Sequence, residues 1–498
     1  MVRLKQILKA LGIAVFAVVF IVLGMYLFFE DQFDDLIERS SLPTIGGDHL
    51  TVKILEPFPA QNNSPLAFDP FSRQRLNQVY ESLIKPDEDL NMEPSLALSW
   101  GLLGDATWEF NIRKNVKFHD GSVMNEMDVI ESLDQARTAP ESELKDLLST
   151  IKEVRRMGPY VIEIETYEPD PLLLQRLSTA YVFSADGEGT GPYVIVENEE
   201  DWLYVQSIDY WDVGVRFASA HINVEQDKFA RVSASADILS YVPYDLVGEI
   251  DLDRLDLVSV PSLEVQFLGF NFGSDLMKDR EMRQAVSMAI NADEFALYVG
   301  EYAHPVKQFV SSGVFGYNSD IKDHEYDPEV ALEQVEGFEF EEEVEITIVL
   351  PMGLDVLGDY LTEALAEIGL GTYVQYVKSA YLVEALEKMD FDIYFLGFKS
   401  ELGDSIDFLK SITHTRAEGY GQYNFSDYSN ERVDELIEKA EVEMDERDRL
   451  DMLQEAMAVL VEDDIFGVPL LEYETLYAAA KWLDFEPRID GFIYLNDL

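Results

Sequence analysis

The sequence of 498 residues contains no cysteine. A disulfide framework, a thiol nucleophile, a thiolate metal site and a lipid attached through cysteine are therefore all excluded. Basic residues are also scarce, because 37 lysines and arginines stand against 96 aspartates and glutamates, for a formal charge of −59. So acidic a surface disfavours nucleic acids and anionic membranes as partners. General solvation explains this charge most simply, and an attraction for cationic ligands is the alternative.

Motifs of catalysis are missing too. Neither H-x-x-x-H nor G-x-S-x-G occurs, and the six histidines lie far apart. The glycine-rich run Asp186–Tyr193 lacks the lysine and hydroxyl residue of a phosphate-binding P-loop, so we interpret it as the entry to a strand. Glu401 and Asp404 could act as the paired carboxylates of a glycosidase, but 96 acids produce such pairs by chance. We therefore predict no enzyme, no metal site and no cofactor.

A long uncharged run is present at the amino terminus. Residues Ala10–Phe29 carry no charge over 20 positions, enough to cross a bilayer core of ~30 Å. Basic residues precede the run and acidic residues follow it, so the positive-inside rule puts the amino terminus in the cytoplasm and the rest outside. A cleaved signal peptide is the alternative, but Met25–Phe29 offers no small residue for cleavage. We predict a transmembrane anchor over 1–29 and a tether over 30–48.

The stretch from Leu96 to Leu133 predicts a strand, a turn and a helix. Apolar residues alternate with polar ones from Trp108 to Ile112, which is the period of a half-buried strand. The sequence His119-Asp120-Gly121 suits a turn, and Asn125 or Met124 could open the helix that follows. Other periodic segments predict strands over 266–272, 345–350 and 393–396, and helices over 143–154, 356–368, 430–440 and 445–461.

Seven motifs in one order resemble a known family. The stretch just described contributes L-A-x-S-W, T-W-x-F-x-I-R and V-K-F-H-D-G. The others are VYESL at 79–83, GTGPY at 189–193, YW at 210–211, DREMRQAVSMAI at 279–290, GVFGYN at 313–318 and YDP at 326–328. From about Glu56 to about Leu470 the chain is similar to the family 5 extracellular solute-binding proteins, the oligopeptide- and dipeptide-binding components of ABC importers. In that family the VYESL-like segment is a helix.

The resemblance implies an α/β, two-lobed, periplasmic-binding-protein-like fold of the class with an extra subdomain. We expect residues 49–265 and 475–498 to form lobe 1, with a subdomain at about 80–185, and residues 266–474 to form lobe 2. The ligand would lie between the lobes and would be a peptide, delivered to the permease subunits of an ABC transporter. The protein would be a monomer held at the cell membrane by its single helix, with the binding domain on the extracellular or periplasmic side.

The resemblance also suggests ligand-binding residues at the end of the strand near 393–396. Glu401 stands where the family has an aspartate that pairs with the α-amino group of the peptide. Main-chain groups of Phe398, Lys399 and Ser400 would bond the peptide backbone as an added strand does. Asp404 takes the place of a second acid, and Lys399 could meet a ligand carboxylate. The family's Trp, Tyr and Pro are absent here, which leaves a solvated turn as the alternative for Glu401.

Two other functions stay open at this point. The same fold binds non-peptide solutes in some members, such as a sugar, a metal chelate or haem. A tethered peptide sensor or chaperone without import is the alternative from another class.

Overall fold

The computed structural model describes residues 51–59, 62–197, 201–212, 215–322, 325–340 and 344–498. The predicted anchor over 1–29 and tether over 30–48 lie outside these residues. Within the described ranges, no helix has both the length and the apolar character needed to cross a membrane.

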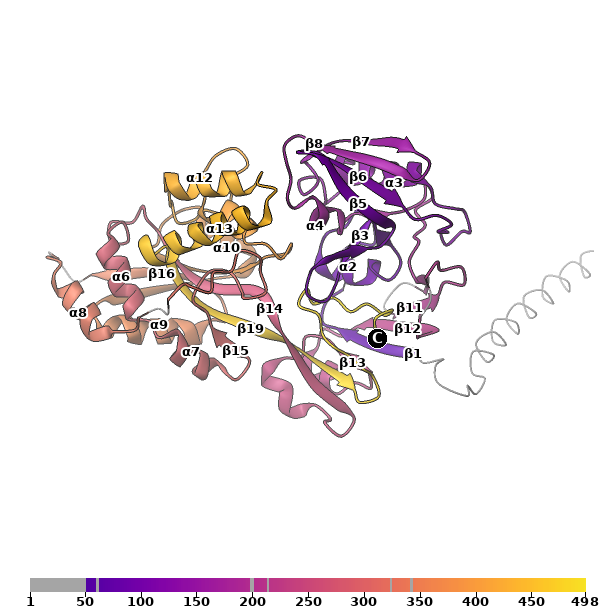
Figure 1. Cartoon of the computed structure of the whole chain (residues 1–498). Helices are drawn as coiled ribbons and strands as arrows, with labels where there is room; N and C mark the ends of the chain where they lie inside the picture. Colours follow the sequence, from indigo (N-terminus) through magenta and orange to yellow (C-terminus); the bar gives the residue numbers. More distant parts are fainter. Residues whose placement is uncertain (1–50, 60–61, 198–200, 213–214, 323–324, 341–343) are drawn as a thin grey trace, which may run out of the picture.

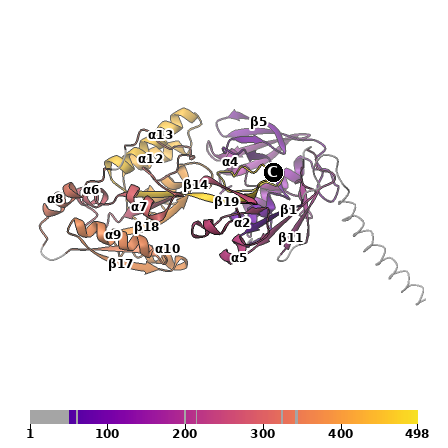
Figure 2. The same ribbon diagram turned by 90° about the horizontal axis from the view of Figure 1, so that it is seen from below.

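The chain forms an α/β structure of two lobes that share one sheet (Figure 1). The strand order is β10-β11-β12-β1-β13-β19-β14-β18-β16-β17, with β15 paired to β19. Two long strands, β14 (Leu255–Phe270) and β19 (Gly467–Ala480), run antiparallel between the lobes. Figure 2 shows both strands crossing from one lobe to the other. The predicted two-lobed fold is therefore confirmed.

Lobe 1 holds one end of this sheet. Its strands are β1 (Thr51–Glu56), β10 (Tyr193–Glu197), β11 (Asp201–Gln206), β12 (Ser219–Val224) and β13 (Ile238–Leu239). The helices α2 (Pro70–Leu76) and α5 (Lys228–Val232) and the 3-10 turn η1 (Tyr244–Glu249) accompany them. β1 pairs in parallel with both β12 and β13, so the apolar residues of β1 are buried.

A smaller subdomain of lobe 1 contains the predicted strand, turn and helix. Its sheet has the order β5-β6-β8-β7, and α3 packs on it. Asn125 caps α3, where Asp128 completes a capping box as expected. The bounds are β5 (Ala97–Gly104), β6 (Thr107–Ile112), β7 (Ile151–Gly158), β8 (Val161–Thr166), α3 (Glu126–Thr138) and α4 (Leu173–Leu177). Short pairs join β2 (Glu81–Ser82) to β9 (Tyr181–Val182) and β3 (Ile84–Pro86) to β4 (Met92–Pro94).

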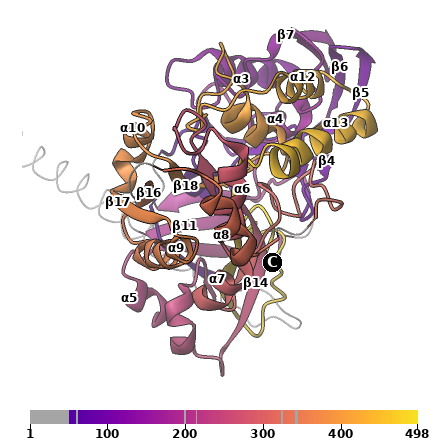
Figure 3. The same cartoon turned by 90° about the vertical axis from the view of Figure 1, so that its left-hand side faces the viewer.

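Lobe 2 places helices on both faces of the other end of the sheet (Figure 3). Its strands are β15 (Ala303–Pro305), β16 (Glu345–Pro351), β17 (Gly371–Val377) and β18 (Ile393–Lys399). One face packs α6 (Arg280–Met288), α7 (Ala292–Val299), α8 (Pro328–Glu336) and α9 (Asp355–Glu367). The other packs α11 (Ile406–Phe408), α12 (Glu431–Ala440) and α13 (Glu446–Ala458) and the π-helical turns η3 (Leu409–Thr413) and η4 (Val459–Asp463). The turn η2 (Ser379–Tyr381) and α10 (Leu382–Leu386) lead into β18.

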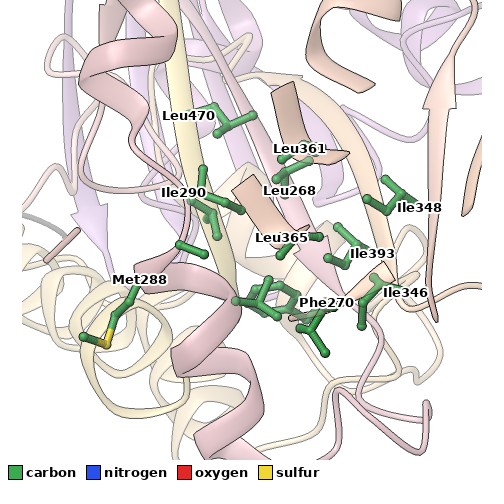
Figure 4. Packing of buried hydrophobic residues seen from close by; sticks show 14 of the residues in the cluster. Leu268, Phe270, Met288, Ile290, Ile346, Ile348, Leu361, Leu365, Ile393 and Leu470 are labelled. Atoms are coloured by element: carbon green, nitrogen blue, oxygen red, sulfur yellow. The ribbon is translucent and has the colours of Figure 1, made fainter. Parts of the chain in front are cut away.

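The period of two along the strands builds these two cores. On β14, Leu268 and Phe270 face the α6–α9 side, whereas Phe267 faces α11–α13. Figure 4 shows Leu268 and Phe270 among Ile393 and the α9 residues Leu361 and Leu365. Side-chain direction on β14 and β18 is therefore fixed by burial before the strands leave the core.

Two predicted helices are wrong. The segment 79–83 is extended, because its main chain is taken by a tertiary partner: the amide of Gly191 donates to the Val79 carbonyl at 2.8 Å. Residues 143–150 form turns, and from Ile151 the chain is β7. At 79–83 a contact between residues far apart in the sequence replaces the helix that the family resemblance implies, and at 151–154 hairpin pairing with β8 overrides a local pattern that fits a helix.

Three of the motifs meet around the carboxylate of Glu81. It accepts hydrogen bonds from the Thr190 hydroxyl at 2.8 Å, the Tyr210 hydroxyl at 3.0 Å and the Trp211 ring nitrogen at 2.9 Å. Glycine is needed beside it, because a Cβ on Gly189 would lie 2.1 Å from the Val79 carbonyl oxygen. These motifs therefore hold lobe 1 together rather than bind phosphate.

Glu81→Gln is expected to flatten the pH dependence of stability. Burial, opposed by the three donors, raises the pKa of Glu81 from 4.5 to about 7. Between these values the folded chain holds a proton that the unfolded chain has lost, so the free energy of unfolding falls as pH rises. Between pH 4.5 and about 7, Glu81 should lower the free energy of unfolding of the wild type by roughly 1–3 kcal/mol.

Urea unfolding of the wild type and of Glu81→Gln at several pH values between 4.5 and 7 measures the difference. Glu88→Gln, at an exposed position of the same lobe, is the control. Parallel curves for the wild type and Glu81→Gln would contradict the assignment.

Candidate functional site

A pocket of about 470 Å³ lies where β14 and β19 pass between the lobes. One side of β14 carries Leu268 and Phe270 into the core of lobe 2. Gln266 and Glu264 follow on the same side of the strand and line the pocket. A β-bulge interrupts the β14–β19 pairing between Pro261 and Val265, next to these residues. Bulges re-aim side chains near functional sites. We call this cavity the hinge pocket, lined by Tyr241, Tyr244, Ser262, Glu264, Gln266, Val299, Lys399, Tyr473, Thr475, Ile489, Asp490 and Gly491.

Tyrosine rings form much of the wall. Tyr244 of η1 stacks on Tyr302 with ring centroids 5.8 Å apart and on Tyr473 of β19 at 5.6 Å. Tyr241 precedes η1 and adopts a left-handed backbone with φ 51°. Aromatic faces of this kind suit both apolar and cationic groups of a ligand.

The structure divides the predicted site residues of β18 between two faces. Lys399 lines the hinge pocket and lies opposite Glu264 in the β14–β18 register. Phe398 faces the other way and packs edge-on against Phe408, with centroids 5.5 Å apart. Ser400 is 1% exposed, and its amide donates to the Leu263 carbonyl at 3.1 Å. The side chains of Phe398 and Ser400 therefore belong to lobe 2, and only their main chain is close to the cleft.

Glu401 stands in the chain between Lys399, which lines the hinge pocket, and Leu402, which lines a second space between the lobes. Its side chain is 37% exposed, and Lys399 Nζ lies 3.6 Å from its Oε2. Burial raises the pKa of Tyr241 to about 12, and the negative charges of Glu56, Glu401 and Asp490 add to this effect. Glu401 is therefore an exposed carboxylate between two lining residues, and it is not itself part of either lining.

Asp404 is held inside lobe 2. Its two carboxylate oxygens accept from Arg449 of α13 at 2.6 and 3.0 Å, and both side chains are under 5% exposed. One oxygen also accepts from the amide of Ile406 at 3.0 Å. The Arg449 guanidinium lies over the ring of Phe315 at 5.3 Å. Asp404 thus fixes the loop that follows Glu401.

The same loop lines a second space between the lobes, of about 550 Å³. Lobe 1 contributes Leu90, Trp108 and Gln175, and lobe 2 contributes Phe315 and Gly403 among others. Gly403 has φ +68°, and a Cβ there would lie 2.7 Å from Leu90 Cδ1. The lobes therefore approach each other at Gly403, where a larger side chain would meet the end of the Leu90 side chain.

β18 also offers main-chain groups. It pairs with β14 from Glu264↔Lys399 to Phe270↔Ile393, but with β16 only at Ile393 and Tyr394. Among the described strands, none pairs with the second edge of residues 395–399. Such an edge can bond an extended peptide.

Sequence reasoning missed Tyr241, Tyr244, Glu264 and Tyr473. A signal for Glu264 does exist, since Ser262, Glu264 and Gln266 alternate with Leu263, Val265 and Phe267. The strand was predicted to begin only at 266. The tyrosines come from distant segments and carry no spacing that could unite them. No group of three or more metal-ligating side chains is arranged for a metal in the part of the chain that the structure describes.

Comparison with known proteins decides the family. The family model described as "Bacterial extracellular solute-binding proteins, family 5 Middle" matches residues 91–420. The chain belongs to this family. The resemblance inferred from the seven motifs is therefore confirmed, and the protein is a solute-binding protein of the kind that serves ABC importers.

Among its relatives, the dipeptide-binding protein of Escherichia coli strain K12 is 22% identical over 452 residues, which cover 80% of this chain and 83% of that protein. Heme-binding protein A of Haemophilus influenzae is 22% identical over 472 residues, 84% of each chain. The structure of HbpA2 from Haemophilus parasuis superposes with a TM-score of 0.79 at 19% identity, over 89% of this chain and 98% of that one. At this identity the structural likeness shows the fold alone.

Asp404→Asn is expected to lower the free energy of unfolding by about 3–5 kcal/mol, because it leaves the buried Arg449 charge unpaired. Urea unfolding measures this, and Asp451→Asn, exposed on the same helix α13, is the control. A loss below about 1 kcal/mol, together with weaker ligand binding, would instead make Asp404 a direct ligand contact.

Proposed function

We propose that the protein captures peptides in the cleft between its lobes and delivers them to the permease subunits of an ABC transporter. The observation that carries this proposal is the position of Glu401. Its exposed carboxylate follows, by two residues, the strand edge that can bond a peptide backbone, and its neighbours Lys399 and Leu402 line spaces between the lobes. A carboxylate beside a β-edge suits the amino terminus of an extended chain.

Each group then has a distinct task. Glu401 accepts a hydrogen bond from the α-ammonium group of the peptide. In the free protein the Lys399 ammonium group is its partner, at 3.6 Å. Main-chain groups on the unpaired edge of residues 395–399 bond the peptide backbone, which reads no particular side chain. Asp404, through Arg449, keeps the Glu401 loop in position. Phe398 contributes only through its backbone, whereas the main chain of Ser400 is already bonded to Leu263 and Gly403.

Ligand contacts with both lobes would favour their closure about β14 and β19. A ligand shifts such an equilibrium only as far as it binds the closed form better than the open form. The closed form would be the one that docks on the permease. We further propose that residues 1–29 anchor this monomer, that the binding domain lies outside the cell, and that the chain performs no turnover.

A non-peptide solute such as a sugar, a metal chelate or haem is the second candidate. The stacked rings of Tyr244, Tyr302 and Tyr473 favour it, since flat or cyclic solutes bind well against aromatic faces. A relative named heme-binding protein A is consistent with this alternative. A tethered sensor or chaperone would use the same cleft without a permease.

Glu401→Gln tests the peptide proposal. It should weaken a peptide with a free amino terminus by roughly tenfold or more and leave the N-acetylated peptide nearly unchanged, since only the former brings an ammonium group. Isothermal titration calorimetry on the full-length chain gives both affinities. Glu418→Gln, at an exposed site of lobe 2, is the matched control. Equal loss for both peptides would show that Glu401 does not hold the ammonium group.

A further inference from the structure

Glu264 is a carboxylate that the proposed backbone recognition does not use. It lies on the floor of the hinge pocket, and a Cβ on Gly397 would come within 2.5 Å of its Oε1. The glycine of β18 therefore leaves the space that the Glu264 side chain occupies. A bulged strand and a glycine beside it both serve to put this carboxylate into the cavity.

Glu264 forms no ion pair among the described residues. The positive charge nearest in register is Lys399, and its ammonium pairs with Glu401 at 3.6 Å. Burial raises the pKa of Glu264, the Lys399 charge and a hydrogen bond from the Gln266 side chain oppose this effect, and the Glu401 charge adds to it. A second cation in the pocket would therefore stabilise two neighbouring carboxylates that now share one lysine.

The other acid of the lining is already neutralised. Asp490 pairs with Arg488 at 2.7 Å, and both side chains are about 10% exposed or less. The rings of Tyr241, Tyr244 and Tyr473 also line the pocket. The pKa values of Tyr244 and Tyr473 are raised by burial first and by Glu264 among the other causes. A carboxylate set among tyrosine rings is an environment for a guanidinium or ammonium group.

We propose that the hinge pocket binds the cationic side chain of an arginine or lysine in the bound peptide, with Glu264 as the residue that determines this specificity. The inference rests on the proposed function and names its substrate class. Glu401 takes the amino terminus, and Glu264 takes the side chain. The pocket volume of about 470 Å³ accommodates a long side chain. Peptides with an acidic side chain at that position are disfavoured by the same carboxylate.

The test uses twelve tripeptides and three proteins. The peptides carry either lysine or its uncharged analogue norleucine, placed in turn at each position, and each has a free or an acetylated amino terminus. The proteins are the full-length wild type, Glu264→Gln and the charge-matched control Asp451→Asn, which alters an exposed acid that is not part of the hinge-pocket lining. Calorimetric affinities are measured at two salt concentrations.

At one position of the peptide, wild type should prefer lysine to norleucine by roughly tenfold to a hundredfold. Glu264→Gln should abolish that preference while norleucine peptides bind as before, and Asp451→Asn should keep it. Glu264→Gln should leave the preference for a free amino terminus intact.

Three outcomes would overturn the proposal. The wild type could bind lysine and norleucine peptides equally, Glu264→Gln could weaken both equally, or Glu264→Gln could remove only the preference for a free amino terminus. In each of these outcomes peptides still bind, so the proposed function survives. Binding of no peptide at all would instead remove the proposed function itself.

Discussion

The antiparallel pairing of β14 with β19 is the interaction on which the rest of the molecule depends. The two strands pair from Leu255↔Ala480 in lobe 1 to Gly269↔Gly467 in lobe 2. Their main-chain hydrogen bonds make one sheet of two lobes, so each lobe is built on strands that it shares with the other. Any rotation of the lobes must be absorbed by this pair of strands.

The interruption of that pairing lies at the site. The register shifts between Pro261 and Val265 and again between Gln266 and Phe267, and the face of β14 changes from apolar to polar between Leu268 and Gln266. The same side that carries Leu268 and Phe270 into the core of lobe 2 carries Gln266 and Glu264 into the cleft. Core and site are therefore two ends of one strand face, and burial at one end fixes the direction of side chains at the other.

Carboxylates near the cleft form ion pairs with individual basic side chains, although the whole chain is strongly acidic. Asp404 is matched by Arg449, Asp490 by Arg488, and Glu401 in part by Lys399. Pairs of this kind are costly to break because each partner is desolvated. Glu264, which forms no ion pair among the described residues, lines the hinge pocket between the lobes.

Much of this fold follows from the sequence, and the site follows only in part. Alternation from Trp108 to Ile112 and the cap at Asn125 are local signals, and the structure agrees with both. The helix predicted over 79–83 is wrong, because the hydrogen bond from the Gly191 amide to the Val79 carbonyl joins residues far apart in the sequence. Glu401 and Lys399 were predicted from a family counterpart of this segment, and the structure places Lys399 in the lining of the hinge pocket. Tyr241, Tyr244 and Tyr473 come together only through the crossing of β14 and β19, which no local pattern encodes.

The central claim is that the cleft holds a peptide. Mass spectrometry of what co-purifies with the full-length protein, released by unfolding, tests it most directly. We expect a series of peptides of different lengths with free amino termini. A single non-peptide species in stoichiometric amount would contradict it and would leave the fold and the family in place.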